Sequence, residues 1–179
     1  MKENGNESAA ESAVGGQIMK KKVFSILADN TSGVLSRVSG LFNRRGFNID
    51  SFTAGETEDP TISRMTIVAN GDDISLDQIQ KQLAKLEDVR EVKELKVGQS
   101  ICRELVLITV GVTPEERTGL ICLVNAFHHA NIVDIEKDSI MIEMTENHEK
   151  INAFISLLDG YEIKEMVRTG IAGLTRGAM

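Results

Sequence analysis

Apolar residues recur along the first half of the chain with two different periods, which predict alternating strands and helices. A short apolar run at residues 23–28 predicts a buried strand, and residues 34–42 carry apolar side chains at helical spacing. The same patterns predict the remaining elements, which are strands at 47–57, 62–69 and 89–97 and a helix over 76–86. The order βαββαβ predicts a four-stranded antiparallel sheet with both helices on one face, the ferredoxin-like arrangement.

Local signals mark the ends of these elements. Thr31 or Ser32 is suited to cap the first helix, because a side-chain oxygen accepts a free N–H group of the first turn, and Gly46 predicts its end. The alternation in the next strand shifts phase, which predicts a bulge or bend near residues 50–51. The chain therefore passes from the first strand to the first helix through a short turn, residues 29–33.

The second half of the chain repeats this order with little residue identity. Thr113 followed by Pro114 predicts the start of a helix, and Thr145 or Asn147 is suited to cap a later one. Strands are predicted at 105–110, 132–135, 140–144 and 161–167. We therefore predict an α+β fold of two tandem ferredoxin-like βαββαβ units.

Composition shifts predict the limits of the two units. Residues 1–18 are rich in Glu, Ser, Ala, Gly and Asn and have no apolar core, which predicts a disordered tail. The first unit is expected to span 19–97 and the second 104–179, joined by a linker at 98–103 around Gly98-Gln99-Ser100.

Composition also narrows the class of protein. A chain of 179 residues with 41% apolar residues is able to bury a core. Its net charge of -7, its 4% aromatic residues and its lack of tryptophan disfavour a nucleic-acid binder, which needs a basic face and aromatic platforms. The sequence has neither an apolar run of membrane-spanning length nor a signal peptide. We expect a cytoplasmic protein that binds neither nucleic acid nor membrane.

The sequence offers little that is typical of an enzyme. It contains no nucleophile-elbow, zinc-protease or phosphate-loop motif, so we predict no catalytic residues and no metal ligands. The acidic stretch at 56–59 has two interpretations, a weak divalent-cation site or a solvated hairpin tip. We favour the hairpin tip because the stretch lacks the ligand spacing of a calcium loop.

The turn at 29–33 is the strongest candidate for a binding site. The N-terminus of a helix presents unpaired N–H groups and a positive dipole end, which suit a carboxylate, and Gly33 lets a ligand approach the backbone. The amide oxygens of Asn30 and Asn48 are able to accept from an ammonium group, and Leu35 or Ile49 would supply an apolar wall. Asn48 and Ile49 begin the next strand, which we expect on the same edge of the fold as the turn.

These features together describe a site for an α-amino acid with an aliphatic side chain. The alternative is purely structural, because Asn, Thr, Ser and Gly are the residues that any strand-to-helix turn prefers. The local pattern leaves both interpretations open.

Longer stretches of the sequence resemble a known family. They are similar to the small regulatory subunit of acetolactate synthase (acetohydroxyacid synthase) and its ACT domain. The matching stretches are DNTSGVLSRV at 29–38, GLF at 40–42, RGFNI at 45–49, DPTISRMT at 59–66, QIQKQLAKL at 78–86 and RTGIAGLTRG at 168–177. The resemblance covers nearly everything from Met19 onward, and residues 1–18 have no counterpart in the bacterial pattern.

The resemblance implies a role in branched-chain amino-acid biosynthesis. The chain would bind and activate a catalytic large subunit that carries thiamine diphosphate, Mg and FAD, and would mediate feedback inhibition by valine, leucine or isoleucine. The first unit would be an ACT domain that forms a homodimer and binds the effector at the dimer interface. The second unit would engage the large subunit. The family's effector contacts would fall on Asn30, Gly33, Val34, Leu35, Asn48 and Ile49.

An alternative function is a free-standing ACT-repeat signalling protein that responds to an amino acid through another partner. In both cases the chain itself would hold no cofactor and would not be an enzyme.

Overall fold

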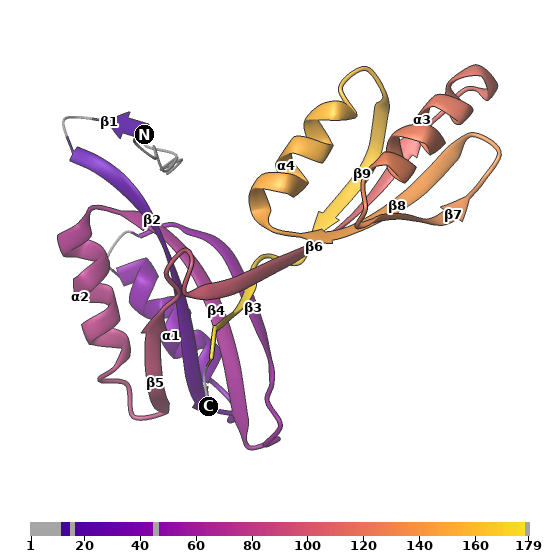
Figure 1. The fold of residues 1–179 in the computed structure, drawn as a ribbon. Coiled ribbons are helices and arrows are strands. Elements are labelled where there is room, and N and C mark those ends of the chain that lie inside the picture. Colours follow the sequence, from indigo (N-terminus) through magenta and orange to yellow (C-terminus); the bar gives the residue numbers. More distant parts are fainter. Residues whose placement is uncertain (1–11, 15–16, 45–46, 178–179) are drawn as a thin grey trace. The chain divides into compact units, whose positions relative to one another are not determined.

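The computed structural model describes residues 12–14, 17–44 and 47–177, and the chain divides into two compact units (Figure 1). One unit comprises Met1–Ser100 with Leu174–Met179, and the other comprises Ile101–Gly173. Each unit contains the βαββαβ order that the apolar pattern predicts, so the predicted fold class is confirmed.

The first unit is built on an antiparallel sheet with the strand order β5-β2-β4-β3. Its strands are β2 (Gln17–Asp29), β3 (Ile49–Glu56), β4 (Ile62–Gly71) and β5 (Val89–Glu94), and its helices are α1 (Val34–Arg44) and α2 (Asp73–Leu83). The predicted bulge is confirmed, because the register of β3 on β4 shifts between Ile49 and Ser51. The predicted helix end at Gly46 lies outside the described residues.

Both helices of this unit contribute to one hydrophobic core on the sheet. Phe24 of β2 and Ile67 of β4 pair directly across the sheet, and both are fully buried. The helices pack buried side chains against them, namely Val38 and Phe42 of α1 and Leu76, Ile79 and Leu83 of α2. This packing fixes the direction of α1 but leaves the turn that precedes it at the surface.

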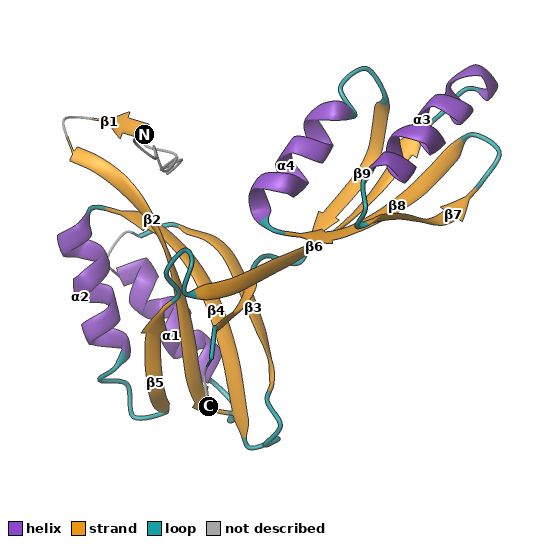
Figure 2. Ribbon diagram, viewed as in Figure 1, coloured by secondary structure: helices purple, strands orange, loops and turns teal. Residues whose placement is uncertain are grey.

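The second unit has the same strand order, β9-β6-β8-β7, again antiparallel (Figure 2). Its elements are β6 (Ser100–Gly111), α3 (Pro114–Ala126), β7 (Ala130–Ile135), β8 (Ser139–Glu146), α4 (His148–Leu157), β9 (Glu162–Arg168) and β10 (Ala172–Thr175). Its core contains Ile108, Leu120, Ile142 and Phe154, all fully buried.

Two helix starts in this unit agree with the sequence signals. Thr113 caps α3 in a capping box, since its hydroxyl accepts from the N–H of Glu116 while the Glu116 carboxylate accepts from the N–H of Thr113. Asn147, rather than Thr145, caps α4 by accepting from the N–H of Lys150 at 2.9 Å. The caps give these helices defined N-terminal ends.

The predicted unit boundaries require correction. The stretch 98–103 is not a linker throughout, because β6 begins at Ser100. Residues 174–179 group with the first unit rather than the second. The N–H of Arg176 donates to the carbonyl of Gln99 at 2.8 Å, which ties this stretch to the first unit, although β10 itself pairs with β6.

Part of the predicted disordered tail, residues 1–18, forms a strand. Residues 1–11 and 15–16 lie outside the described residues. β1 (Ser12–Val14) pairs antiparallel with the start of β2, which begins at Gln17. Composition reports on side chains, whereas this pairing uses backbone groups, so a polar composition does not exclude it.

Candidate functional site

The β2–α1 turn places Gly33 at the end of the turn and Val34 at the start of the helix. Gly33 has φ of 86°, a conformation that other residues rarely adopt. Its carbonyl accepts from the N–H of Arg37 at 3.0 Å, and the carbonyl of Thr31 accepts from the N–H of Val34 at 3.4 Å. The turn therefore depends on glycine for its backbone geometry.

No side chain of the described residues caps α1, so the predicted cap at Thr31 or Ser32 is wrong. The helix begins at Val34, and the capping position is therefore occupied by Gly33, which has no side chain. The N–H groups of Leu35 and Ser36 consequently have no acceptor within the described chain. These donors lie at the positive end of an 11-residue helix, which favours a bound anion.

Arginine and aspartate side chains surround this turn. Arg37 Nε donates to Asp88 Oδ2 at 2.6 Å, and Arg90 Nε donates to Asp29 Oδ1 at 2.6 Å. A Cβ atom added at Gly33 would lie 3.0 Å from Arg37 Nη1. The turn is thus braced by two ion pairs and has little room for a side chain at Gly33.

Asn30 connects the turn to the hairpin between β3 and β4. Its backbone N–H donates to the carbonyl of Thr61 at 2.7 Å. Its side-chain Nδ2 donates to the carbonyl of Pro60 at 2.9 Å and to Glu56 Oε1 at 3.3 Å, and its Oδ1 accepts from Ser63 Oγ at 3.0 Å. The Asn30 carboxamide is therefore held in one orientation by hairpin groups.

The other predicted site residues have different environments. Val34 is buried with 2% of its surface exposed, and it packs in the core rather than at the surface. Leu35 is 51% exposed and is available as an apolar wall beside the free N–H groups. Asn48 is exposed and Ile49 is half-buried against the core.

The structure corrects the expectation that Asn48 and Ile49 lie beside the turn in the same chain. Asp29 pairs with Ile62 at one end of β4, whereas Ile49 pairs with Ala69 at the other end. From Ile62 to Ala69 the strand advances 69 − 62 = 7 residues, which corresponds to roughly 23 Å at about 3.3 Å per residue. Sequence proximity was misleading because α1 carries the chain back along the whole sheet before β3 begins.

The acidic stretch at 56–59 is part of a structured hairpin tip. Asp59 Oδ1 accepts from the N–H of Thr61 at 2.9 Å and from Thr61 Oγ1 at 2.7 Å. These hydrogen bonds hold the pKa of the Asp59 carboxyl below its ordinary value. The stretch thus contributes to turn geometry.

A group of charged side chains in the second unit was not predicted. Glu104 of β6 and Glu146 of β8 pair directly across the sheet, and each is only 4% exposed. Arg168 approaches Glu104 with two atoms, Nε at 2.7 Å from Oε1 and Nη2 at 2.8 Å from Oε2. Like charges at opposite positions destabilise a sheet, so this pair of carboxylates requires cations of its own.

The remaining partners complete this group. His148 Nδ1 lies 3.0 Å from Glu104 Oε2, and Lys150 Nζ lies 3.0 Å from Glu146 Oε1. Glu146 Oε2 also accepts from the N–H of Asn147 at 2.9 Å. A sequence signal did exist, because Glu104 is in phase with the buried residues Val106 and Ile108 along β6.

The group makes the stability of the second unit dependent on pH. Burial raises the pKa of Glu104, but hydrogen bonds from Arg168 and His148 lower it more, so it lies below the ordinary value of 4.5. The pKa of Glu146 is lowered by the hydrogen bonds from Asn147 and Lys150. A folded-state pKa below the unfolded value stabilises the fold above the unfolded pKa, and this stabilisation is lost as pH falls through the folded-state pKa.

We therefore expect the second unit to lose stability as the pH falls below about 4.5. Urea denaturation at a series of pH values, followed by the fluorescence of Tyr161, would measure it, since the chain has one tyrosine and no tryptophan. The control is the double variant Glu104→Gln/Glu146→Gln, in which the slope below this pH should be smaller. An unchanged slope in the double variant would contradict the assignment.

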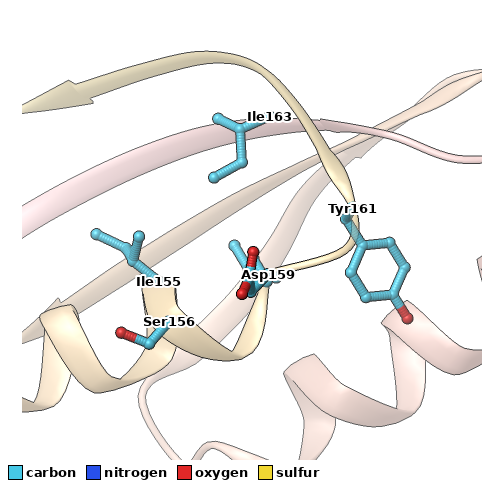
Figure 3. A pocket seen from close by; sticks show the side chains of 6 residues that line it. Ile155, Ser156, Asp159, Tyr161 and Ile163 are labelled. Atoms are coloured by element: carbon cyan, nitrogen blue, oxygen red, sulfur yellow. The ribbon is translucent and has the colours of Figure 1, made fainter.

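A hollow of about 440 Å³ lies elsewhere, between the end of α4 and the start of β9 (Figure 3). It is lined by Ile155, Ser156, Leu158, Asp159, Tyr161 and Ile163. The hydroxyl of Tyr161 is 3.3 Å from where a Cβ on Gly119 would lie, so the ring reaches α3. The hollow belongs to the second unit and contains no residue of the β2–α1 turn.

Two further properties concern the described part of the chain. In residues 12–14, 17–44 and 47–177, no three His, Cys, Asp or Glu side chains gather so as to hold a metal ion. Within those same ranges, no helix has the length and apolar character needed to cross a membrane. The β2–α1 turn with its free N–H groups therefore remains the candidate site.

Comparison with known proteins gives consistent matches over both units. Residues 24–91 match the family described as the AHAS small subunit-like ACT domain, and residues 103–177 match the family described as the small subunit of acetolactate synthase. A probable acetolactate synthase small subunit of Archaeoglobus fulgidus is 48% identical over 157 residues, which cover 88% of this chain and 98% of that protein.

Two further relatives support the same match. The corresponding probable small subunit of Methanothermobacter thermautotrophicus is 46% identical over 157 residues, covering 87% of this chain and 93% of that protein. The crystal structure of the acetolactate synthase small subunit from Thermotoga maritima superposes with a TM-score of 0.81 at 37% identity. That match covers 89% of this chain and 99% of the Thermotoga chain.

Proposed function

The chain belongs to the family of acetolactate synthase small subunits, and from this membership we propose that it regulates acetolactate synthase in response to a branched-chain amino acid. It would bind the catalytic large subunit, raise its activity and transmit feedback inhibition by valine, leucine or isoleucine. The large subunit would hold thiamine diphosphate, Mg and FAD and perform the reaction. This chain would supply the effector site and would couple effector binding to the activity of the large subunit.

The observation that carries the effector site is the pair of free N–H groups at the start of α1. Leu35 and Ser36 direct unpaired donors to the surface, where the dipole of α1 favours an effector carboxylate. The exposed side chain of Leu35 lies next to these donors and suits an aliphatic side chain. The oxygen of Asn30 accepts one hydrogen bond, from Ser63, and retains a lone pair for an ammonium group.

A second copy of the chain is needed to complete this site. β3 pairs with β4 on one side, and no described strand lies on its other side. Antiparallel pairing of β3 with β3 of a second copy, about a two-fold axis, would place the start of one strand beside the end of the other. Asn48 and Ile49 would then lie near Glu56 of the other copy, which is 3.3 Å from Asn30 in its own chain.

Such a dimer would account for the separation of the predicted residues within one chain. Asn30, Gly33 and Leu35 would form one half of each site, and Asn48 and Ile49 would come from the other copy. Val34 supports the turn from the core. Each homodimer would contain two equivalent sites, as two-fold symmetry requires.

Regulation would follow from a shift between dimer arrangements. An effector that contacts both copies favours the arrangement in which the two half-sites fit it, and its influence is limited by its differential affinity for the two states, typically about 1–3 kcal/mol. The second unit would carry the change to the large subunit.

The direct test is calorimetric titration of the purified chain with valine, leucine and isoleucine, together with reconstitution with a large subunit. We expect one or more of these amino acids to bind with a stoichiometry of one per chain and to inhibit the reconstituted enzyme. A large subunit should be recovered by the tagged chain from its source cell. Absence of binding for all three amino acids would refute the proposal.

A further inference from the structure

Ser63 of β4 is half-buried and donates its hydroxyl proton to Asn30 Oδ1 at 3.0 Å. This contact is one of several that hold the Asn30 carboxamide. The Pro60 carbonyl is only an acceptor, so the Nδ2 end of Asn30 must face it, as the distance of 2.9 Å shows. The oxygen end must then face the Ser63 hydroxyl, which is able to donate.

The hairpin positions both groups that orient Asn30. The backbone N–H of Asn30 donates to Thr61 at 2.7 Å, and Ser63 pairs with Ala28 in the register of β2 on β4. Because these backbone bonds fix the two strands, the Ser63 hydroxyl is held opposite the Asn30 oxygen. Rotation of the carboxamide by half a turn would place two acceptors, Oδ1 and the Pro60 carbonyl, against each other.

We propose that Ser63 is a positioning residue of the effector site, an inference that rests on the proposed function. Ser63 does not touch the effector. Its hydroxyl occupies one lone pair of Asn30 Oδ1, and the second lone pair is thereby directed to accept from the ammonium group of the amino acid. Asn30 is therefore preorganised before the effector arrives, and the loss of this preorganisation weakens binding.

The test compares Ser63→Ala with Ser63→Thr in the full-length chain. Ser63→Ala removes the donor and is expected to weaken binding of whichever amino acid binds the wild-type chain by about five- to tenfold, the effect of one lost hydrogen bond. Ser63→Thr keeps a hydroxyl in a residue that suits a strand, and binding is expected to return to within about twofold of the wild type.

A matched control is Ser39→Ala, which removes another serine hydroxyl from the first unit. Ser39 Oγ donates to the carbonyl of Leu35 at 2.9 Å within α1 and has no contact with Asn30. We expect its effector affinity to remain near that of the wild type. The temperature of unfolding measured for each variant separates a loss of folding from a loss of binding.

Ser63→Cys is the second variant, because it preserves volume while its thiol is a weak donor. Weakened binding in folded Ser63→Cys supports the proposal, and wild-type affinity in folded Ser63→Ala or Ser63→Cys overturns it. A wild-type chain that binds none of the three amino acids refutes the proposed function instead. The two failures are therefore distinguishable in one set of titrations.

Discussion

Replacing Gly33 by aspartate is expected to abolish the response to the amino-acid effector while the chain still activates the large subunit. Gly33 has φ of 86°, which an aspartate tolerates poorly, and its Cβ would lie 3.0 Å from Arg37 Nη1. The new carboxylate would also compete with the effector carboxylate for the free N–H groups of α1. We expect effector affinity to fall by about 30-fold, since an anion at a helix N-terminus gains up to roughly 2 kcal/mol.

Titration of the variant and inhibition assays with the reconstituted enzyme would measure this effect. Gly40→Ala is the matched control, because Gly40 lies within α1 and the nearest atom to its added Cβ, Arg44 Nη1, is at an ordinary 3.6 Å. It should bind the effector normally and stabilise the helix by about 0.5–1 kcal/mol. Full inhibition of the Gly33→Asp enzyme would show that the site is assigned to the wrong turn.

Replacing Arg168 by methionine is expected to destabilise the second unit more than any other single change in its charged group. Arg168 makes the two shortest side-chain contacts to the carboxylate of Glu104, which lies opposite the buried Glu146. Methionine fills similar space but leaves Glu104 with His148 as its remaining side-chain hydrogen-bond partner. We expect a loss of roughly 3 kcal/mol in the free energy of unfolding, the lower end for a broken buried ion pair.

Urea denaturation at neutral pH, followed by Tyr161 fluorescence, would measure this loss. The double variant Glu104→Gln/Arg168→Met also removes the Glu104 carboxylate that has lost its arginine partner, and it should recover most of the stability. A double-mutant cycle with Glu104→Gln then isolates the energy of the pair. If Arg168→Met unfolds at the same urea concentration as the wild type, the pair contributes nothing and our account of the group is incorrect.

The order of elements was predictable because each element is encoded by neighbouring residues. The apolar stripe of α1, the capping box at Thr113 and the bulge at Ile49–Ser51 all depend on a few consecutive positions. Such signals need no knowledge of distant parts of the chain. The fold class follows from their order, since few topologies satisfy βαββαβ.

Features that depend on residues far apart in the sequence were harder to predict from it. The position of Asn48 relative to the β2–α1 turn is set by strand register, which the sequence pattern does not state. The carboxylates of Glu104 and Glu146 are brought together by β6 and β8 from positions 42 residues apart (146 − 104). The predicted cap at Thr31 or Ser32 was wrong because Gly33, which has no side chain, stands directly before the helix.

The grouping of Leu174–Met179 with Met1–Ser100 has a consequence for biosynthesis. During translation, Ile101–Gly173 are synthesised after Met1–Ser100 and before Leu174–Met179, the last segment of the first unit. Its sheet and helices are free to assemble as they leave the ribosome, but Leu174–Met179 are added only after Ile101–Gly173 have been made. A nascent chain stalled before residue 174 would therefore present the first unit with its sheet formed but without Leu174–Met179.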